Sequence, residues 1–321
     1  MQKKILLERV RLESDIRKFL GEKILNNCPQ VAVETNISPE LFYEKYVLQN
    51  KPVVIKGLLD GWSAYSKWDF DYFANNFADA NVVMDLYDIK KTEKSSLKEG
   101  IRQIKSASTD KPVYLQEWWF QYDCPAILED FTIPPHFEND ENLRLFGYVN
   151  STLWLGSKGA CTPIHDDSVY SNIWVSQIKG CKEWMLFDKN ACLFAKDDGE
   201  PDYEEFLRNP DNNVMHYRVQ KGDTLYVPHK WWHRAYTLED AISLNSFYIS
   251  DEIVRRYIKD VLSIPMAVSL NSELLQEHDL RRYNICMTRI KMLCRFMKMD
   301  EENILGINTS SSTKEKGRKV A

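Results

Sequence analysis

The sequence lacks the features of a membrane-spanning, secreted or strongly basic protein. No apolar run approaches the roughly 20 residues that span a bilayer, and the N-terminal stretch MQKKILLERVRLESDIRKFL has no continuous apolar core of the kind a signal peptide needs. The seven cysteines form no CxxC pair, and their odd number and loose spacing favour free thiols in a reducing compartment. The net charge of −5 argues against broad binding to a polyanion. We therefore expect a cytoplasmic protein, with the nucleus as the alternative, and no membrane association.

The composition is that of a globular protein with a large core. Hydrophobic residues make up 44% and aromatic residues 12% of the 321 positions, so a core can form without disulfide bonds. The first part of the chain mixes helical and strand patterns. We expect, in order, an amphipathic helix at 3–25, a helix that begins at Ser38-Pro39, a strand at KPVVIKGLL that ends at Gly57, a helix at 66–78, a strand at VVMDLYDI, a helix at SLKEGIRQIKSA and a strand at PVYLQEWWF.

From about residue 144 the pattern changes to dense apolar alternation with frequent turns. The expected strands are LFGYVNSTLWLG, SNIWVSQI, KEWMLFD, VMHYRV, DTLYVPH and AISLNSFYI. Gly180 and Gly222 stand between pairs of these segments and indicate two hairpins. Many short strands separated by tight turns predict a closed barrel or a sandwich.

After residue 250 the periodicity is again helical. We divide the chain into an N-terminal helical segment at 1–35, a main domain at 36–250 with its barrel core at about 144–250, a C-terminal helical segment at 251–305 and a polar, disordered tail at 306–321. The apolar stripes of the C-terminal helices predict either packing onto the chain's own core or an isologous homodimer.

A candidate metal site begins at TPIHDD, where His165 and Asp167 stand two positions apart. In an extended strand such residues point to the same face, and Asp166 points away. A lone HxD is more often a pair of surface residues, and a third ligand has to come from elsewhere in the chain. The candidates are the other histidines, namely His136, His216, His229, His233 and His278.

His233 is the strongest of these candidates. It lies in GDTLYVPHKWWHRAY, where Pro228 ends a predicted strand and Trp231 and Trp232 supply aromatic cover, while His229 is an alternative four residues earlier. Two histidines and one carboxylate occupy one face of an octahedron and leave positions open, which suits Fe(II) that must bind substrate and oxygen together. Zinc would favour a closed tetrahedral site or a third neutral ligand.

At this point the chain resembles a known family. The segments WLGSKGACTPIHDD, NIWVSQIKGCKEWMLFD and VQKGDTLYVPHKWWHRAYTLEDAISLNSF are similar to the JmjC-domain family of Fe(II)- and 2-oxoglutarate-dependent oxygenases, above all to its small stand-alone hydroxylases such as the asparaginyl hydroxylase of hypoxia-inducible factor. FYEKYVLQNKPVVIKGLLDGWSAYSKWDFDYFANNF resembles the lead-in of those proteins, so the likeness covers about residues 38–250. It implies a mainly β fold, with a double-stranded β-helix (jelly-roll or cupin) core, an N-terminal α/β lead-in and C-terminal helices.

The resemblance also implies roles for individual residues. It assigns the iron to His165, Asp167 and His233, and leaves His229 as a neighbour, because the family's ligand follows the tryptophan pair. Lys182 matches the residue that holds the distal carboxylate of 2-oxoglutarate, and a carboxylate that enters an apolar barrel does need a paired charge. Further contacts to the cosubstrate or the pocket are implied for Thr162, Tyr114, Asn172 and Asn245. The structural alternatives are a solvent-facing hairpin lysine at 182, a turn cap at Thr162 and a core aromatic at Tyr114. His136, His216 and His278 lie outside the motif, and we interpret them as structural or solvated.

If the resemblance holds, the cofactor is Fe(II), the cosubstrates are 2-oxoglutarate and O2, and the products include succinate and CO2. The favoured substrate is a side chain of a protein. The alternatives are oxidation of a modified tRNA base, which the acidic composition disfavours, oxidation of a small molecule, and lysine demethylation. A degenerate barrel that acts as a binding scaffold is the non-enzymatic alternative. The acidic segment between Lys189 and Met215 is where we expect substrate preference to be encoded.

Overall fold

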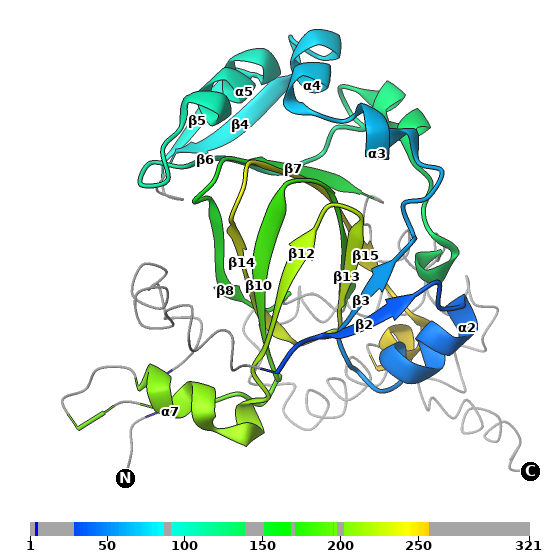
Figure 1. Ribbon diagram of the computed structural model, residues 1–321, viewed down its shortest axis with the longest axis vertical. Helices are drawn as coiled ribbons and strands as arrows, with labels where there is room; N and C mark the ends of the chain where they lie inside the picture. The colour runs from blue at the N-terminus through cyan, green and yellow to red at the C-terminus, as the bar shows by residue number, and fades with distance from the viewer. Residues whose placement is uncertain are drawn as a thin grey trace, which may run out of the picture. The chain divides into compact units, whose positions relative to one another are not determined.

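The computed structural model describes residues 4–5, 29–86, 91–138, 151–167, 171–194, 196–197 and 202–256 (Figure 1). The chain divides into two units, one of residues 1–143 and 148–250 and the other of residues 144–147 and 251–321. In the second unit the described residues are 251–256, which are helical. The predicted tail and the rest of the C-terminal helices lie outside the described residues, and with them the choice between packing onto the chain's own core and forming a homodimer.

Two antiparallel sheets build the core of the first unit. The four-stranded sheet has the order β12 (Met215–Gln220), β10 (Cys181–Phe187), β14 (Trp232–Thr237) and β8 (Cys161–His165). The nine-stranded sheet has the order β2 (Ala32–Thr35), β3 (Val53–Lys56), β13 (Asp223–Val227), β9 (Asn172–Lys179), β15 (Ala241–Tyr248), β7 (Thr152–Gly156), β6 (Val113–Trp118), β4 (Asn81–Leu86) and β5 (Thr92–Ser96). Its pairs are antiparallel apart from β2 and β3, which run parallel. The architecture confirms the predicted mainly β, jelly-roll core.

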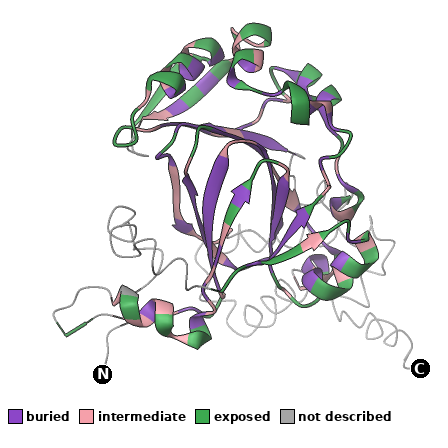
Figure 2. Ribbon diagram, in the orientation of Figure 1, coloured by how far each residue is buried: buried purple, intermediate pink, exposed green. Residues whose placement is uncertain are grey.

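The inner faces of the two sheets pack against each other. One buried cluster joins Val175 and Leu225 of the nine-stranded sheet to Trp184, Leu186 and Val219 of the four-stranded sheet. In Figure 2 β10 and β13 are buried along their whole length and β8 and β12 only in part, while the flanking helices expose their outer faces. Buried strands carry mostly apolar residues. The dense apolar pattern after residue 144 therefore predicted strands in this part of the chain.

The two predicted hairpins at Gly180 and Gly222 are wrong. β9 and β10 flank Gly180 but belong to different sheets, and β12 and β13 flank Gly222 in the same way. Each glycine lies where the chain crosses from one sheet to the other. Both have positive φ, 71° at Gly180 and 95° at Gly222, and a Cβ at Gly180 would collide with the backbone oxygen of Asp240. A tight turn marks where a strand ends, but it does not fix which strand the next one pairs with.

The lead-in is largely as predicted, with local differences. Ser38 caps α2 (Pro39–Phe42), which continues into the π-helical turn η2 (Tyr43–Val47). The single helix expected at 66–78 is two helices, α3 (Ser63–Lys67) and α4 (Phe70–Asn76), because the Asp69 side chain accepts a hydrogen bond from the backbone N–H of Tyr72 and starts a new helix. β5, which pairs with β4, was not predicted.

The remaining short elements complete the first unit. They are α5 (Leu97–Ser106), the 3-10 turns η3 (Pro125–Asp130), η4 (Pro135–Phe137) and η5 (Pro210–Asn212), β11 (Leu193–Phe194) and α7 (Tyr203–Arg208). Part of the predicted N-terminal helix is contradicted, because Lys4–Ile5 forms strand β1 and pairs with β11. β2 likewise falls in the 1–35 segment that we expected to be helical. The rest of the predicted helix at 3–25 lies outside the described residues. Among the helices that are described, none has the length and apolar character needed to cross a membrane.

Candidate functional site

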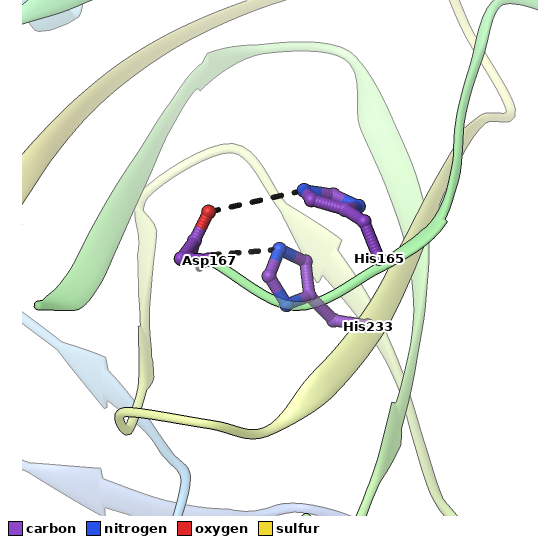
Figure 3. A group of neighbouring side chains, drawn as sticks. All are labelled: His165, Asp167 and His233. Carbon is purple, nitrogen blue, oxygen red and sulfur yellow. Dashed lines mark ion pairs between the residues drawn. The ribbon is translucent and has the colours of Figure 1, made fainter. Parts of the chain in front are cut away.

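The structure brings His165, Asp167 and His233 together at one end of the four-stranded sheet. His165 is the last residue of β8, His233 lies opposite it on β14, and the ring centroids are 4.1 Å apart. From the sequence we expected Asp167 to continue the same extended strand as His165. In the structure Asp167 lies two residues beyond the end of β8. One ligand atom from each side chain lies within 4.8 Å of the other two, and all three point toward one shared space (Figure 3).

The backbone fixes how both imidazoles present themselves. Nδ1 of His165 lies 2.8 Å from the carbonyl oxygen of Pro163, and Nδ1 of His233 lies 3.0 Å from that of Trp231. A carbonyl can only accept, so each Nδ1 carries the proton and donates it. Each Nε2 then keeps its lone pair, and each lies 3.9 Å from a carboxylate oxygen of Asp167. This is the tautomer that a metal requires, held by a partner on the far side of the ring.

Burial keeps His233 in the neutral, ligating form. Its side chain is 3% exposed, and burial first, with the neighbouring His165 second, lowers its pKa to about 4. The indole of Trp184 on β10 stacks on its ring at 5.8 Å. Trp231 is buried, and its Nε1 donates to the backbone oxygen of Asn50 at 3.0 Å.

The other described histidines do not join this group. In the part of the chain that the structure describes, His165, Asp167 and His233 are the one cluster of three or more potential ligands. His136 contacts the backbone oxygen of Ile37 at 2.7 Å, and buried His216 lies 3.4 Å from the carboxylate of Glu183. His229 is buried. His278 lies outside the described residues. Asp166 turns away from the site, toward Lys230 at 3.7 Å.

A cavity of about 240 Å³ opens beside the three ligands, and Lys182 lines it. Lys182 is 2% exposed, and burial lowers the pKa of its ammonium to about 7. Its Nζ donates to the phenolic oxygen of Tyr114 at 3.1 Å, and no described carboxylate pairs with it. A buried cation without a counter-ion is costly, so the position suits a ligand that brings a negative charge.

The structure groups most, but not all, of the predicted cosubstrate residues. Tyr114, Thr162, Lys182 and Asn245 all line the cavity. Burial raises the pKa of Tyr114 above its usual range, so the phenol stays protonated, and Thr162 hydrogen-bonds to it. The Oδ1 atom of Asn245 is buried and has no hydrogen-bond partner among the described residues. A bound ligand could supply one.

Asn172 does not line the cavity, contrary to the sequence-based prediction. Its amide nitrogen donates to the backbone oxygen of Tyr248 at 2.9 Å, and its side-chain oxygen accepts from the backbone N–H of His229 at 2.9 Å. Both ends of the amide are thus used to join chain segments around β9. The resemblance indicated a role at the pocket for Asn172, but its side chain bonds to backbone groups instead of lining the cavity.

Several lining residues were missed by the sequence argument. Thr152 and Trp154 project from β7, and Trp184 from β10. Strand alternation could have indicated Thr152 and Trp154. Both lie on β7 at alternate positions from Gly156, so the three share a face, and Gly156 pairs with the cavity residue Tyr114. Glu117 also lines the cavity, and simple alternation along β6 would have pointed it elsewhere.

Comparison with known proteins agrees with this geometry. Residues 39–252 match the model of the cupin-like domain. An arginine-specific demethylase of Arabidopsis thaliana is 25% identical over 67% of this chain and 45% of its own length, and a 2-oxoglutarate and iron-dependent oxygenase of Gallus gallus is 26% identical over 65% and 57%. A bifunctional arginine demethylase and lysyl-hydroxylase of Caenorhabditis elegans is 25% identical over 78% and 71%. The chain thus spans about half the length of the first two relatives.

Proposed function

Because the chain belongs to the cupin-like domain family, we propose that it is an Fe(II)- and 2-oxoglutarate-dependent dioxygenase that hydroxylates a side chain of a protein substrate. The observation that carries the proposal is the pairing of two features in one cavity. Three ligands converge on one side of an open space, and a buried lysine that has no counter-ion among the described residues lies in the same cavity. The first feature suits an iron with open positions, and the second suits the carboxylate of a cosubstrate.

The residues present fit these groups. His165, Asp167 and His233 would hold the iron, with both imidazoles already in the ligating tautomer. Lys182 and Tyr114 would bind the far carboxylate of 2-oxoglutarate and orient it. When bound, iron and 2-oxoglutarate supply the oxidation, in which O2 gives one oxygen atom to a substrate C–H bond and one to succinate, with release of CO2. Ile173 and Ala235 add apolar side chains to the lining of the cavity.

The relatives support a protein substrate. The Arabidopsis thaliana relative is named as an arginine demethylase, and the Caenorhabditis elegans relative as both an arginine demethylase and a lysyl-hydroxylase. Demethylation is therefore the second candidate, in which the oxygen is placed on an N-methyl group that then leaves as formaldehyde. Oxidation of a tRNA base is less favoured, because the chain carries a net charge of −5.

The test is formation of succinate from 2-oxoglutarate by the purified chain with Fe(II) and O2, with and without a protein extract. We expect succinate formation that depends on iron and rises with extract. Mass spectrometry of the extract proteins then separates the two candidates, since hydroxylation adds one oxygen atom and demethylation removes a CH2 unit. Absence of iron-dependent succinate formation under all these conditions would contradict the proposal.

A further inference from the structure

The cavity beside the ligands has an acidic residue for which the proposed chemistry has no use. Glu117 on β6 lines the same space as Asp167 and Lys182. Asp167 is committed to the metal and Lys182 to the cosubstrate in the proposed function. Glu117 remains as a charge at the cavity, and it is exposed to solvent there, as a residue at an entrance would be.

A β-bulge directs Glu117 into the cavity. Along β6, Leu115 pairs with Leu155 and Trp118 with Leu153, so that β6 advances three residues while β7 advances two. The extra residue changes the phase of the strand. Tyr114 and Glu117 face the cavity, whereas Leu115 and Trp118 belong to the hydrophobic core on the other side. Without the bulge, the face that holds Tyr114 would continue to Gln116 instead of Glu117.

The backbone at Glu117 takes an unusual conformation to achieve this. Its φ is 50°, in the left-handed region that residues with a side chain seldom occupy. Bulges that carry such residues are common beside active sites, where they re-aim a side chain. The residue with the unusual backbone conformation is also the residue that lines the cavity. We therefore interpret the conformation as the means by which the Glu117 side chain reaches the cavity.

The carboxylate of Glu117 has no partner in the part of the chain that the structure describes. No described residue donates a hydrogen bond to it or forms an ion pair with it, whereas Asp166 has Lys230 nearby. A positive group that entered the cavity would give this carboxylate the ion-pair partner that the described residues do not supply.

We propose that Glu117 determines substrate specificity by favouring a cationic substrate side chain, lysine or arginine, over a neutral one of similar size. The inference rests on the proposed function, because it takes this cavity as the substrate site. The cavity then serves opposite charges, with buried Lys182 for an anionic cosubstrate and exposed Glu117 for a cationic substrate. A charge pair at such an entrance acts mainly on selection between substrates.

The experiment uses pools of peptides with random flanks and one fixed central residue, so that the natural sequence need not be known. The central residue is lysine, arginine, norleucine, citrulline or glutamate. The 321-residue chain is immobilised with Mn(II) and N-oxalylglycine, which replace iron and 2-oxoglutarate without turnover, and the bound peptides are quantified by mass spectrometry. We expect enrichment of lysine over norleucine, or of arginine over citrulline, by roughly tenfold, the value of one hydrogen-bonded charge pair.

Two variants and a matched control complete the test. Glu117→Gln should abolish the enrichment of lysine and arginine peptides. Glu117→Lys should instead enrich the peptides with a central glutamate, and a misfolded protein could not produce this gain of binding. Glu93→Gln removes the same charge from exposed β5, outside the cavity lining, and should keep the enrichment of the wild type. No cationic enrichment by the wild type, or enrichment that survives in both Glu117 variants, would overturn the inference. Succinate formation is measured separately on the wild type, so a failure of the dioxygenase proposal is told apart from a failure of the Glu117 role.

Discussion

His165 and His233 lie opposite each other in the antiparallel pair of β8 and β14, and the register of that pair shifts next to them. From His233 to Ala235 β14 advances two residues, while from His165 to Thr162 β8 advances three. A second bulge, between β6 and β7, places Glu117. Both irregularities border the same cavity, and both turn a polar side chain toward it. In a jelly-roll whose inner faces are otherwise packed, bulges of this kind let functional groups replace core residues.

The first prediction concerns Asp167. Asp167→Asn keeps the shape of the side chain but removes the charge that two neutral imidazoles cannot supply. We expect affinity for Fe(II) to fall by more than about a hundredfold and succinate formation to be lost with it. Asp166→Asn is the matched control, because Asp166 faces Lys230 and should leave metal content unchanged. The checks are metal analysis after gel filtration and the succinate assay, and an Asp167→Asn protein that keeps stoichiometric iron would contradict the assignment.

How far the sequence predicted this site depends on where each residue lies. The apolar pattern predicted β9, β10, β12, β13 and β15, because most of these strands carry apolar residues along the buried part of the sheets. It did not give β8 or β14 their own strands, although they carry both histidines. Pro163 interrupts the first, and the charged and aromatic mixture in WHRAYT hides the second. Functional strands carry polar residues on faces that would otherwise be apolar, which is what weakens the pattern.

The individual cavity residues show the same limit. The resemblance indicated Lys182, Thr162, Tyr114 and Asn245, and all of these line the cavity. Asn172 was indicated in the same way but bonds to backbone on both sides. Glu117 had no signal, because the position of a bulge depends on the pairing of β6 with β7, which no local pattern encodes. Pairing between distant strands is also what made Gly180 and Gly222 look like hairpin turns.

The second prediction concerns the proton on Lys182. Burial lowers its pKa to about 7 in the absence of a ligand, whereas a bound carboxylate would raise it. At pH 8, binding of 2-oxoglutarate should therefore be accompanied by uptake of up to about one proton, and the affinity should weaken as pH rises from 7 to 9. Calorimetric titrations in buffers with different ionisation enthalpies measure the uptake.

Two variants of Lys182 serve as controls for this prediction. Lys182→Arg keeps a fixed charge and should bind without proton uptake, since arginine stays protonated in proteins. Lys182→Met should lose most of the affinity. Equal proton uptake by the wild type and the arginine variant would show that the proton goes to another group.

The third prediction concerns Gly156, which pairs with Tyr114 across β6 and β7. A Cβ at this position would lie 2.8 Å from Cδ2 of the Tyr114 ring, closer than side chains tolerate, so the ring has to move. Gly156→Ala should therefore weaken the hydrogen bond between Tyr114 and Lys182 and raise the KM for 2-oxoglutarate roughly fivefold, the value of about one hydrogen bond. The effect should be smaller when Gly156→Ala is made in a Tyr114→Phe background, where the hydroxyl is already absent. Full additivity of the two changes would mean that the glycine acts by another route.

The last prediction concerns Asp130, which joins η3 to α3 and α4 away from the cavity. Its carboxylate accepts hydrogen bonds from Ser63 at 2.7 Å, Lys67 at 2.8 Å, Trp68 at 2.9 Å and Tyr72 at 2.6 Å. Burial alone would raise its pKa, but these four donors together lower it well below the usual range. Asp130→Asn removes the charge and places the NH2 group of the amide, itself a donor, next to the donors of the surrounding side chains. The free energy of unfolding should therefore fall by about 2 kcal/mol.

The pH dependence of that loss identifies its cause. A carboxyl whose pKa is lower in the folded than in the unfolded chain stabilises the fold fully above the unfolded pKa of about 3.9, and this stability is lost as pH falls toward the folded pKa. The difference in unfolding free energy between wild type and Asp130→Asn should thus be constant from about pH 8 to pH 5 and shrink below about pH 4. Urea unfolding at several pH values measures it, with Asp123→Asn, a change at an exposed carboxylate, as the control. A difference that stayed constant into acid would mean that the variant lost packing rather than a charge.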